Sequence, residues 1–163
     1  MSKTCVFAGT FDPPTVGHRD VIDKALKIFD GVTVAVMINP RKSCLFSEDE
    51  RLALLKELYK NEPRVKVRTY RGAAVDLLRE ENTPFYVRGV RDCIDFDYEN
   101  RDRYASEKLM PEMITIYIPA DQSDVFVSSS LVRNSVKFDK EFMQYIPAEI
   151  REAVKKLSEA KNV

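Results

Sequence analysis

The segment from Gly9 to His18 carries the residues best suited to chemistry, and it reads Gly-Thr-Phe-Asp-Pro-Pro-Thr-Val-Gly-His. His18 is the only histidine of the chain, and an imidazole at the start of a helix can donate a hydrogen bond to a phosphoryl oxygen. Free backbone N–H groups and the helix dipole also favour an anion at that place. The segment therefore predicts a phosphate-binding turn, and the simpler alternative is a turn that only connects two elements.

Two elements must hold this turn. Residues 4–7 form a short β-branched and apolar run, which predicts a buried strand. Val21, Ile22, Ala25, Leu26 and Phe29 follow at the three- and four-residue spacing of an amphipathic helix. Pro13 and Pro14 stiffen the turn between them.

Further candidates follow other expected strands. Lys42 comes after the apolar run 32–38, which predicts a central parallel strand. Arg88-Gly89-Val90-Arg91 follows an expected strand at 84–87, and an arginine offers a planar fork for phosphate oxygens. The alternatives are a solvated lysine and a turn with salt bridges to Asp92 or Asp95. Ser128-Ser129-Ser130 predicts either an anion site at a helix start or simple capping.

The remaining pattern alternates strands with helices. Strands are expected at 65–70 and 113–118, and helices after Ser47, at 75–79, at 92–110, after Ser130 and after Pro147. Leu52, Leu55 and Leu58 are expected to point inward, and the tail from Ser158 is expected to fray. The pattern predicts an α/β fold, a single-domain Rossmann-like doubly wound parallel five-stranded sheet with C-terminal helices over residues 1–163. Ligands bind such sheets outside the carboxyl ends of the strands.

Composition narrows the class. Lysine plus arginine equals aspartate plus glutamate, 26 against 26, so no global field favours nucleic acid or a membrane. The three cysteines, Cys5, Cys44 and Cys93, have no C-x-x-C pair, which favours reduced thiols in a cytoplasmic protein, and with one histidine they predict no protein metal site. Neither a signal peptide nor a membrane-spanning run is expected.

Familiar nucleotide and hydrolase motifs are missing from the sequence. It contains no G-x-x-x-x-G-K-[ST], no G-x-G-x-x-G and no G-x-S-x-G. P-loop ATPase, dinucleotide oxidoreductase and serine hydrolase interpretations therefore lose their main support.

Several motifs together resemble bacterial phosphopantetheine adenylyltransferases, over residues 4 to about 150. They are Gly-Thr-Phe-Asp-Pro with Thr-x-Gly-His, Lys42 before Phe46-Ser47 and Glu50-Arg51, Arg-Gly-Val-Arg with Asp95-Phe96 and Tyr98-Glu99, Leu-Met-Pro-Glu at 109–112, and Ser-Ser-Ser-Leu-Val. The resemblance implies transfer of AMP from ATP to 4′-phosphopantetheine, giving dephospho-coenzyme A and pyrophosphate, with Mg²⁺ bound mainly through the ATP phosphates. It also implies a homohexamer.

The resemblance also assigns residues. Thr10 and His18 would contact the reacting phosphates, Lys42 and Arg88 the phosphopantetheine side, and Ala74 the pantetheine arm. ATP would be held by Thr10, Phe11, His18, Gly89, Val90, Arg91, Glu99, Asp124, Val125, Phe126, Val127, Ser128, Ser129 and Ser130. In-line attack by a phosphate on an α-phosphorus needs positive donors and positioning, with no covalent nucleophile. The donors would come from His18, Lys42, Arg88 and Arg91, and Thr10 would orient the reacting phosphates.

Some positions depart from the family pattern. Asp102, Ala105 and Ser106 stand where the family commonly has leucine, a small or apolar residue and asparagine, and most such changes fall on the acceptor side. Two other functions stay open on the sequence alone. One is a nucleotidyltransferase with a different phosphorylated acceptor, and the other is a non-catalytic nucleotide-binding oligomer.

Overall fold

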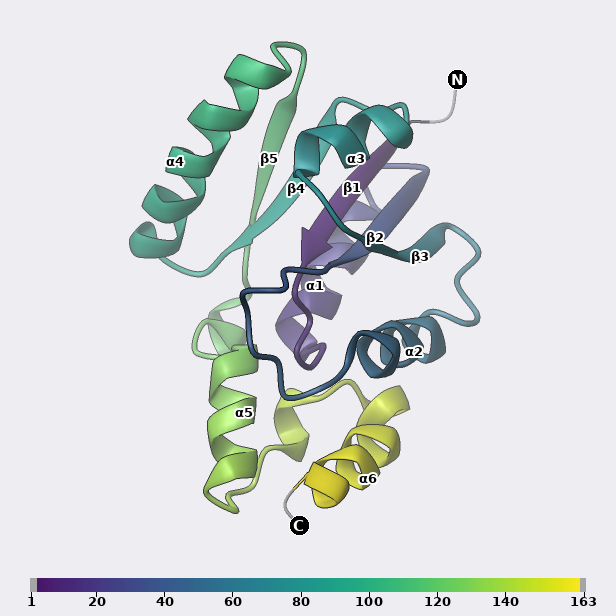
Figure 1. The fold of residues 1–163 in the computed structure, drawn as a ribbon, viewed down its shortest axis with the longest axis vertical. Helices are drawn as coiled ribbons and strands as arrows, with labels where there is room; N and C mark the ends of the chain where they lie inside the picture. The colour runs from purple at the N-terminus through teal and green to yellow at the C-terminus, as the bar shows by residue number, and fades with distance from the viewer. Residues whose placement is uncertain (1–2, 162–163) are drawn as a thin grey trace.

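The computed structural model describes residues 3–161 as a parallel sheet covered by helices (Figure 1). The strands are β1 (Thr4–Gly9), β2 (Gly31–Met37), β3 (Val65–Tyr70), β4 (Phe85–Val90) and β5 (Ile114–Pro119). They pair in the order β3-β2-β1-β4-β5, and every pairing is parallel. The doubly wound five-stranded parallel sheet predicted from the sequence is confirmed.

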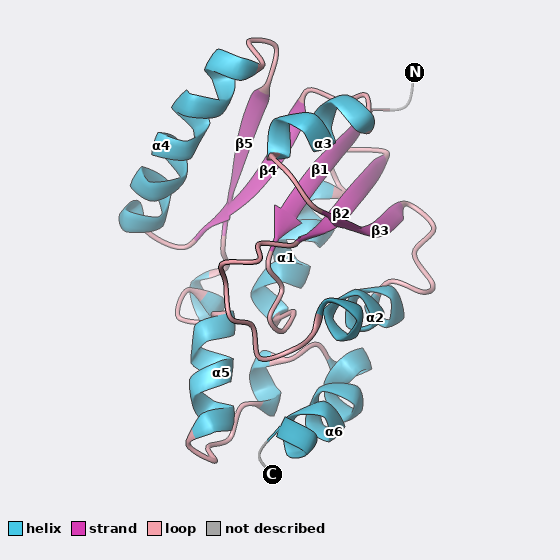
Figure 2. Ribbon diagram, viewed as in Figure 1, coloured by secondary structure: helices cyan, strands magenta, loops and turns pink. Residues whose placement is uncertain are grey.

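Helices α1 (Val16–Ala25), α2 (Glu48–Leu58), α3 (Ala74–Glu80) and α4 (Cys93–Leu109) alternate with the strands, and α5 (Ser129–Lys137) and α6 (Arg151–Lys161) follow them. Figure 2 shows α3 and α1 on opposite faces of the sheet, with α5 and α6 beyond its carboxyl edge. Capping boxes fix the starts of α1, at Thr15 and His18, and of α2, at Ser47 and Glu50.

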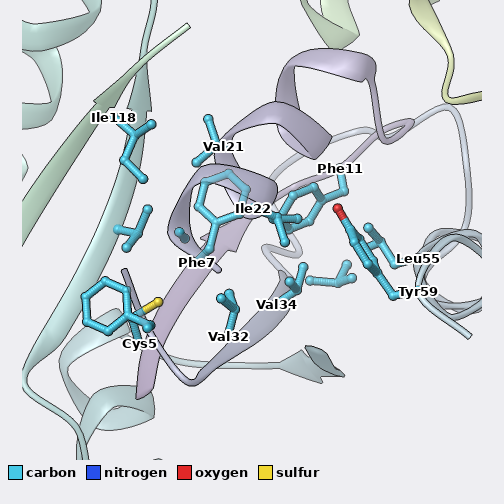
Figure 3. Close-up of a cluster of buried hydrophobic side chains, with 14 residues drawn as sticks. Cys5, Phe7, Phe11, Val21, Ile22, Val32, Val34, Leu55, Tyr59 and Ile118 are labelled. Carbon is cyan, nitrogen blue, oxygen red and sulfur yellow. The ribbon is translucent and has the colours of Figure 1, made fainter. Parts of the chain in front are cut away.

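Two apolar layers hold the sheet between its helices. On one face, Phe7, Val32 and Val34 pack in one cluster with Val21 and Ile22 of α1 (Figure 3). On the other face, side chains of the alternate strand positions, among them Val6, Ala8 and Ala35, pack against α3. A third cluster joins α2 to α5 and α6.

The ladder between β1 and β4 is short. Only Val6 with Tyr86 and Phe7 with Val87 are paired. From β1 the chain runs outward to β2 and then β3, and it afterwards crosses to β4 on the other side of β1. The direction of winding therefore changes between β1 and β4. Ligand sites of open α/β sheets lie at this switch point.

The structure corrects three details of the sequence prediction. β4 extends to Val90, so Arg88 and Gly89 lie within a strand that pairs with β5. In α2, Leu54 and Leu55 are buried while Leu52 and Leu58 are only half-buried. Beyond Pro147 a 3₁₀ turn precedes α6, which begins at Arg151.

The predicted fraying from Ser158 is also wrong as far as Lys161. Ser158 is buried, and its hydroxyl donates to the carbonyl oxygen of Val154 at 2.8 Å. Residues 162 and 163 lie outside the described part of the chain.

Candidate active site

A cavity of about 360 Å³, here called cavity 1, opens at the carboxyl ends of β1 and β4 and the first turns of α1 and α5. Most of the site residues predicted from the sequence line it: Thr10, Phe11, His18, Arg88, Gly89, Val90, Arg91, Glu99, Asp124, Val127, Ser128, Ser129 and Ser130. Segments more than 100 positions apart in the chain therefore meet at one place, as the strand-end argument predicts.

The imidazole of His18 is held in one tautomer by the helix cap. The backbone N–H of Thr15 donates to Nδ1 at 3.0 Å, and the Thr15 hydroxyl lies at 3.0 Å from the same atom. Since Nδ1 accepts a hydrogen bond, the ring proton lies on Nε2. Burial, and then the charges of Arg91 and Arg88, lower the pKa of His18 from 6.5 to about 4. His18 is therefore a neutral imidazole with Nε2–H as its donor near neutral pH.

Aromatic rings support this imidazole. The ring of Phe11 lies 4.9 Å from it, centroid to centroid, in an edge geometry. That ring is only 1% exposed and also packs on Phe7. Phe11 was predicted to bind ATP, and the structure gives its side chain a place in the core beside His18.

Arg88 is fixed by several contacts. Its guanidinium pairs with both carboxylate oxygens of Glu99, and the Nε–Oε2 distance is 2.6 Å. Its Nη1 donates to the carbonyl oxygen of Ala8 at 2.8 Å and to the Tyr86 hydroxyl at 3.1 Å. Arg88 thus bridges the diverging ends of β1 and β4, and Glu99, predicted to bind ATP, is engaged with it.

Arg91 has the ion pair that the alternative interpretation proposed. Its Nε lies 2.7 Å from Asp95 Oδ2, and its Nη2 lies 3.1 Å from Oδ1. This pairing raises the pKa of Arg91. Arg91 nevertheless lines cavity 1, so it contributes positive charge there while Asp95 holds its orientation.

Gly89 has a structural role besides its place at cavity 1. A Cβ built at Gly89 would lie 2.7 Å from Cγ2 of Val21. The absent side chain therefore lets α1 pack closely on β4 and sets the distance between His18 and the strand that carries Arg88.

The serine segment caps α5 and also faces cavity 1. The backbone N–H of Leu131 donates to Ser128 Oγ at 3.1 Å, and Ser129 Oγ donates to the carbonyl oxygen of Pro13 at 2.8 Å. The first turn of α5 is thereby tied to the Gly9–His18 turn, and both predicted roles, capping and a place at the cavity, fit the geometry.

Four predicted residues lie outside cavity 1. Lys42 is exposed on a turn, where its backbone N–H donates to the carbonyl oxygen of Asn39 at 3.0 Å. Val125 and Phe126 are exposed, and the Phe126 ring lies against Tyr145. Ala74 lines a second cavity.

This second cavity, here called cavity 2, measures about 300 Å³ and lies over β4 and β5 between α3 and α4. Asp102, Ala105 and Ser106 of α4 line it with Ala74, so the three positions that depart from the family pattern lie in the same cavity as the residue assigned to the pantetheine arm. Arg88 and Glu99 line both cavities, which makes the two spaces neighbours.

Three polar residues with clear structural roles were missed. Arg51 is buried and donates through Nη1 to the carbonyl oxygen of Thr10 at 2.7 Å. The Asp12 carboxylate accepts from the backbone N–H groups of Leu45 and Phe46 at 2.9 and 2.8 Å. Arg133, which lines cavity 1, donates to the carbonyl oxygen of Asp12 at 2.9 Å.

A signal for two of these residues was present in the sequence. Asp12 lies within the Gly9–His18 segment, and Arg51 lies among the matched motifs. Arg133 falls on the helix after the serines without a distinctive pattern, and only the packing of α5 against the turn reveals it.

Within residues 3–161, no three or more His, Cys, Asp or Glu side chains are grouped to hold a metal ion. None of the helices in that range is long and apolar enough to cross a membrane.

Comparison with known structures supports the fold. A putative nicotinate-nucleotide adenylyltransferase from Vibrio parahaemolyticus superposes with a TM-score of 0.70 at 20% identity, over 97% of this chain and 95% of the other. A bifunctional NMN adenylyltransferase/ADP ribose pyrophosphatase from Francisella tularensis gives 0.75 at 16% identity, over all of this chain and 51% of the other.

Comparison with known sequences identifies the family. Residues 6–135 match the cytidylyltransferase-like family model. Phosphopantetheine adenylyltransferase from Thermotoga neapolitana is 40% identical over 96% of this chain and 98% of its own length. The protein of the same name from Campylobacter fetus is 38% identical over 95% and 98%. With the motif residues gathered around one cavity at the switch point, this chain belongs to the phosphopantetheine adenylyltransferase family of cytidylyltransferase-like proteins.

Proposed function

We propose that this chain transfers AMP from ATP to 4′-phosphopantetheine, forming dephospho-coenzyme A and pyrophosphate in coenzyme A biosynthesis. The observation that carries the proposal is the neutral Nε2–H donor of His18 beside Arg88 and Arg91, at the switch point of a chain of this family. These donors suit a reaction in which negative charge builds on phosphoryl oxygens.

In the proposed reaction, a phosphate oxygen of the acceptor forms a bond to the α-phosphorus of ATP. The bond from that phosphorus to the bridging oxygen breaks, and pyrophosphate leaves with the electron pair. His18 donates to an oxygen of the α-phosphoryl group, and the N–H groups at the starts of α1 and α5 donate to phosphate oxygens. Thr10, which follows β1 and lines the same cavity, orients the reacting groups.

The acceptor phosphate is assigned to the Arg88 side of the site, where cavities 1 and 2 adjoin. Lys42 is assigned to the same acceptor phosphate. This contact requires the exposed turn 39–42 to close over the bound acceptor. ATP occupies cavity 1 beside Gly89, Val90, Arg91 and Asp124–Ser130. Catalysis then consists of positioning and charge stabilisation, without a covalent enzyme intermediate.

We propose that Mg²⁺ enters with ATP. Two of the three acidic residues that line cavity 1, Asp95 and Glu99, are paired with Arg91 and Arg88, which supports a metal held mainly by phosphates and water. The ion would neutralise charge on the leaving pyrophosphate.

We also propose a homohexamer in the cytoplasm. The support for assembly is an uncovered apolar surface: α4 has no buried residue, and its Ile94 and Tyr98 side chains are 80% and 66% exposed. The three free cysteines are compatible with a reducing compartment. Light scattering at micromolar concentration tests the oligomer, and a monomer mass would refute it.

A pyrophosphate-release assay tests the function. ATP is supplied with 4′-phosphopantetheine or with a panel of other phosphorylated acceptors, and the product is identified by mass. Release that depends on 4′-phosphopantetheine is expected. Turnover with a different acceptor alone would reassign the substrate, and nucleotide binding without turnover on any acceptor would favour a binding protein.

A further inference from the structure

Two residues that line cavity 2 each carry a buried polar atom without a hydrogen-bond partner. Among the described residues three buried side-chain N or O atoms are unpaired, and two of them, Thr115 Oγ1 and Arg103 Nε, belong to residues that line this cavity. The third, the hydroxyl of Tyr59, lies elsewhere in the core. Native proteins pair nearly all such atoms, so two in one cavity call for a partner that is not part of the chain.

The two atoms come from opposite walls. Thr115 lies on β5 in register with Tyr86 of β4, and both line cavity 2. Arg103 lies on α4, where its Nη1 is 3.0 Å from Glu107 Oε1 and its guanidinium lies 4.6 Å from the centroid of the Tyr104 ring. These contacts hold the arginine head in place and leave its buried Nε–H unpaired.

The hydrogen-bonding capacities of these two atoms indicate which chemical group of a ligand they would bind. An arginine Nε–H only donates, whereas a threonine hydroxyl both donates and accepts. An amide offers a carbonyl acceptor and an N–H donor on adjacent atoms, so it matches this pair. The other lining residues include the apolar Ala74, Ala105 and Met113 beside the polar Asp102 and Ser106, which suits an arm that combines aliphatic segments with amides.

We propose that Thr115 and Arg103 determine acceptor specificity by forming hydrogen bonds with an amide of the acceptor's arm in cavity 2. The inference rests on the proposed function, in which an acceptor phosphate at Arg88 extends an amide-bearing arm into the adjoining cavity. It goes further by naming two residues, neither of them among the predicted site residues, that select an amide over an apolar chain.

Thr115→Val removes the hydroxyl and keeps the shape, while Arg103→Lys keeps the charge and removes Nε–H. Each is expected to raise the KM for 4′-phosphopantetheine, by about five-fold and about ten-fold respectively, the effect of one neutral and one charged hydrogen bond. The KM for ATP and kcat should stay within about two-fold, because neither residue lines cavity 1. Thr115→Ser restores the hydroxyl and should restore the KM. Matched controls are Thr69→Val on β3 and Arg64→Lys before it, both away from cavity 2.

A thermal measurement separates this role from a structural one. Removing an unpaired buried hydroxyl stabilises a protein, so Thr115→Val should raise the Tm of the ligand-free protein, by about 2–4 °C for a chain of this size. A higher Tm together with a higher acceptor KM supports the proposal. An unchanged or lower Tm would mean that the hydroxyl already has a partner in the free protein, and would overturn it.

An acceptor whose arm amides are replaced by methylene groups identifies the partner. Wild type and both variants should use this analogue with equal KM if the amide is what Thr115 and Arg103 recognise. A persistent difference, or no effect of either variant on the natural acceptor, overturns the proposal. Calorimetry of 4′-phosphopantetheine binding separates failure of this inference from failure of the proposed function. If the ligand binds without turnover and the variants weaken its binding, only the proposed function is refuted. If the ligand does not bind the wild type, both are refuted.

Discussion

Because His18 is the only histidine of the chain, its titration can be followed in the pH dependence of the free energy of unfolding. In the folded protein the pKa of His18 is about 4, against an ordinary value of 6.5 that applies to the unfolded chain. Between these values the unfolded state binds a proton that the folded state does not. The free energy of unfolding must therefore fall as the pH drops from about 6.5 towards 4, and above pH 6.5 this contribution is constant.

The size of the effect follows from the same two values. The slope approaches about 1.4 kcal/mol per pH unit for one proton, and the whole difference amounts to about 3 kcal/mol. The physical reason is that protonating Nδ1 would oppose two donors, the backbone N–H and hydroxyl of Thr15, in a site that also faces Arg88 and Arg91.

Urea unfolding at pH 7.5, 6.5, 5.5 and 4.5 measures this slope, with His18→Gln as the matched variant. Glutamine at the third helical position can keep the capping box and cannot titrate. Carboxylates contribute equally to both proteins, so the difference between their curves isolates the histidine. Wild type should lose about 2–3 kcal/mol relative to the variant between pH 6.5 and 4.5. Parallel curves would refute the neutral, capped imidazole.

Three further predictions concern catalysis, packing and the acceptor groove. His18→Ala should lower kcat by about 10²–10³ in pyrophosphate release with little change in ATP affinity, because the donor acts mainly on transition-state charge; an unchanged kcat contradicts this role. Gly89→Ala should destabilise by about 1–3 kcal/mol in urea unfolding, since its Cβ would meet Val21 at 2.7 Å, and adding Val21→Ala should recover part of the loss. Asp102→Leu with Ser106→Asn should tighten 4′-phosphopantetheine by roughly 1–2 kcal/mol in calorimetry, by easing desolvation of a carboxylate in cavity 2; equal affinity would place the arm elsewhere.

Much of the fold was predictable because local signals and global topology agree. The apolar run 32–38 indicated a central strand, and β2 does lie between two neighbours. Ser47 with Glu50 indicated the start of α2, and both capping bonds are present. Since parallel strands place their carboxyl ends at one edge, the positions of His18 and Arg88 at the same cavity also followed from sequence.

Other features depend on distances that no local pattern encodes. Arg88 looked like part of a turn because glycine and charge usually end a strand, yet pairing with β5 continues β4 through Val90. Burial of Leu54 instead of Leu52 depends on where α5 and α6 pack against α2. The contact of Arg133 with Asp12 joins residues 121 positions apart, and the unpaired atoms of cavity 2 emerge only when both walls are in place.

Transfer of the α-phosphoryl group tests the central claim most directly. ATP labelled at the α-phosphorus is incubated with 4′-phosphopantetheine and either wild-type protein or His18→Ala. The wild type should move the label into a product that joins AMP to the acceptor phosphate, release unlabelled pyrophosphate, and do so at least about 100-fold faster than the variant. Label that stays in ATP, or transfer at equal rates by both proteins, would contradict the assignment of adenylyl transfer to the His18 cavity.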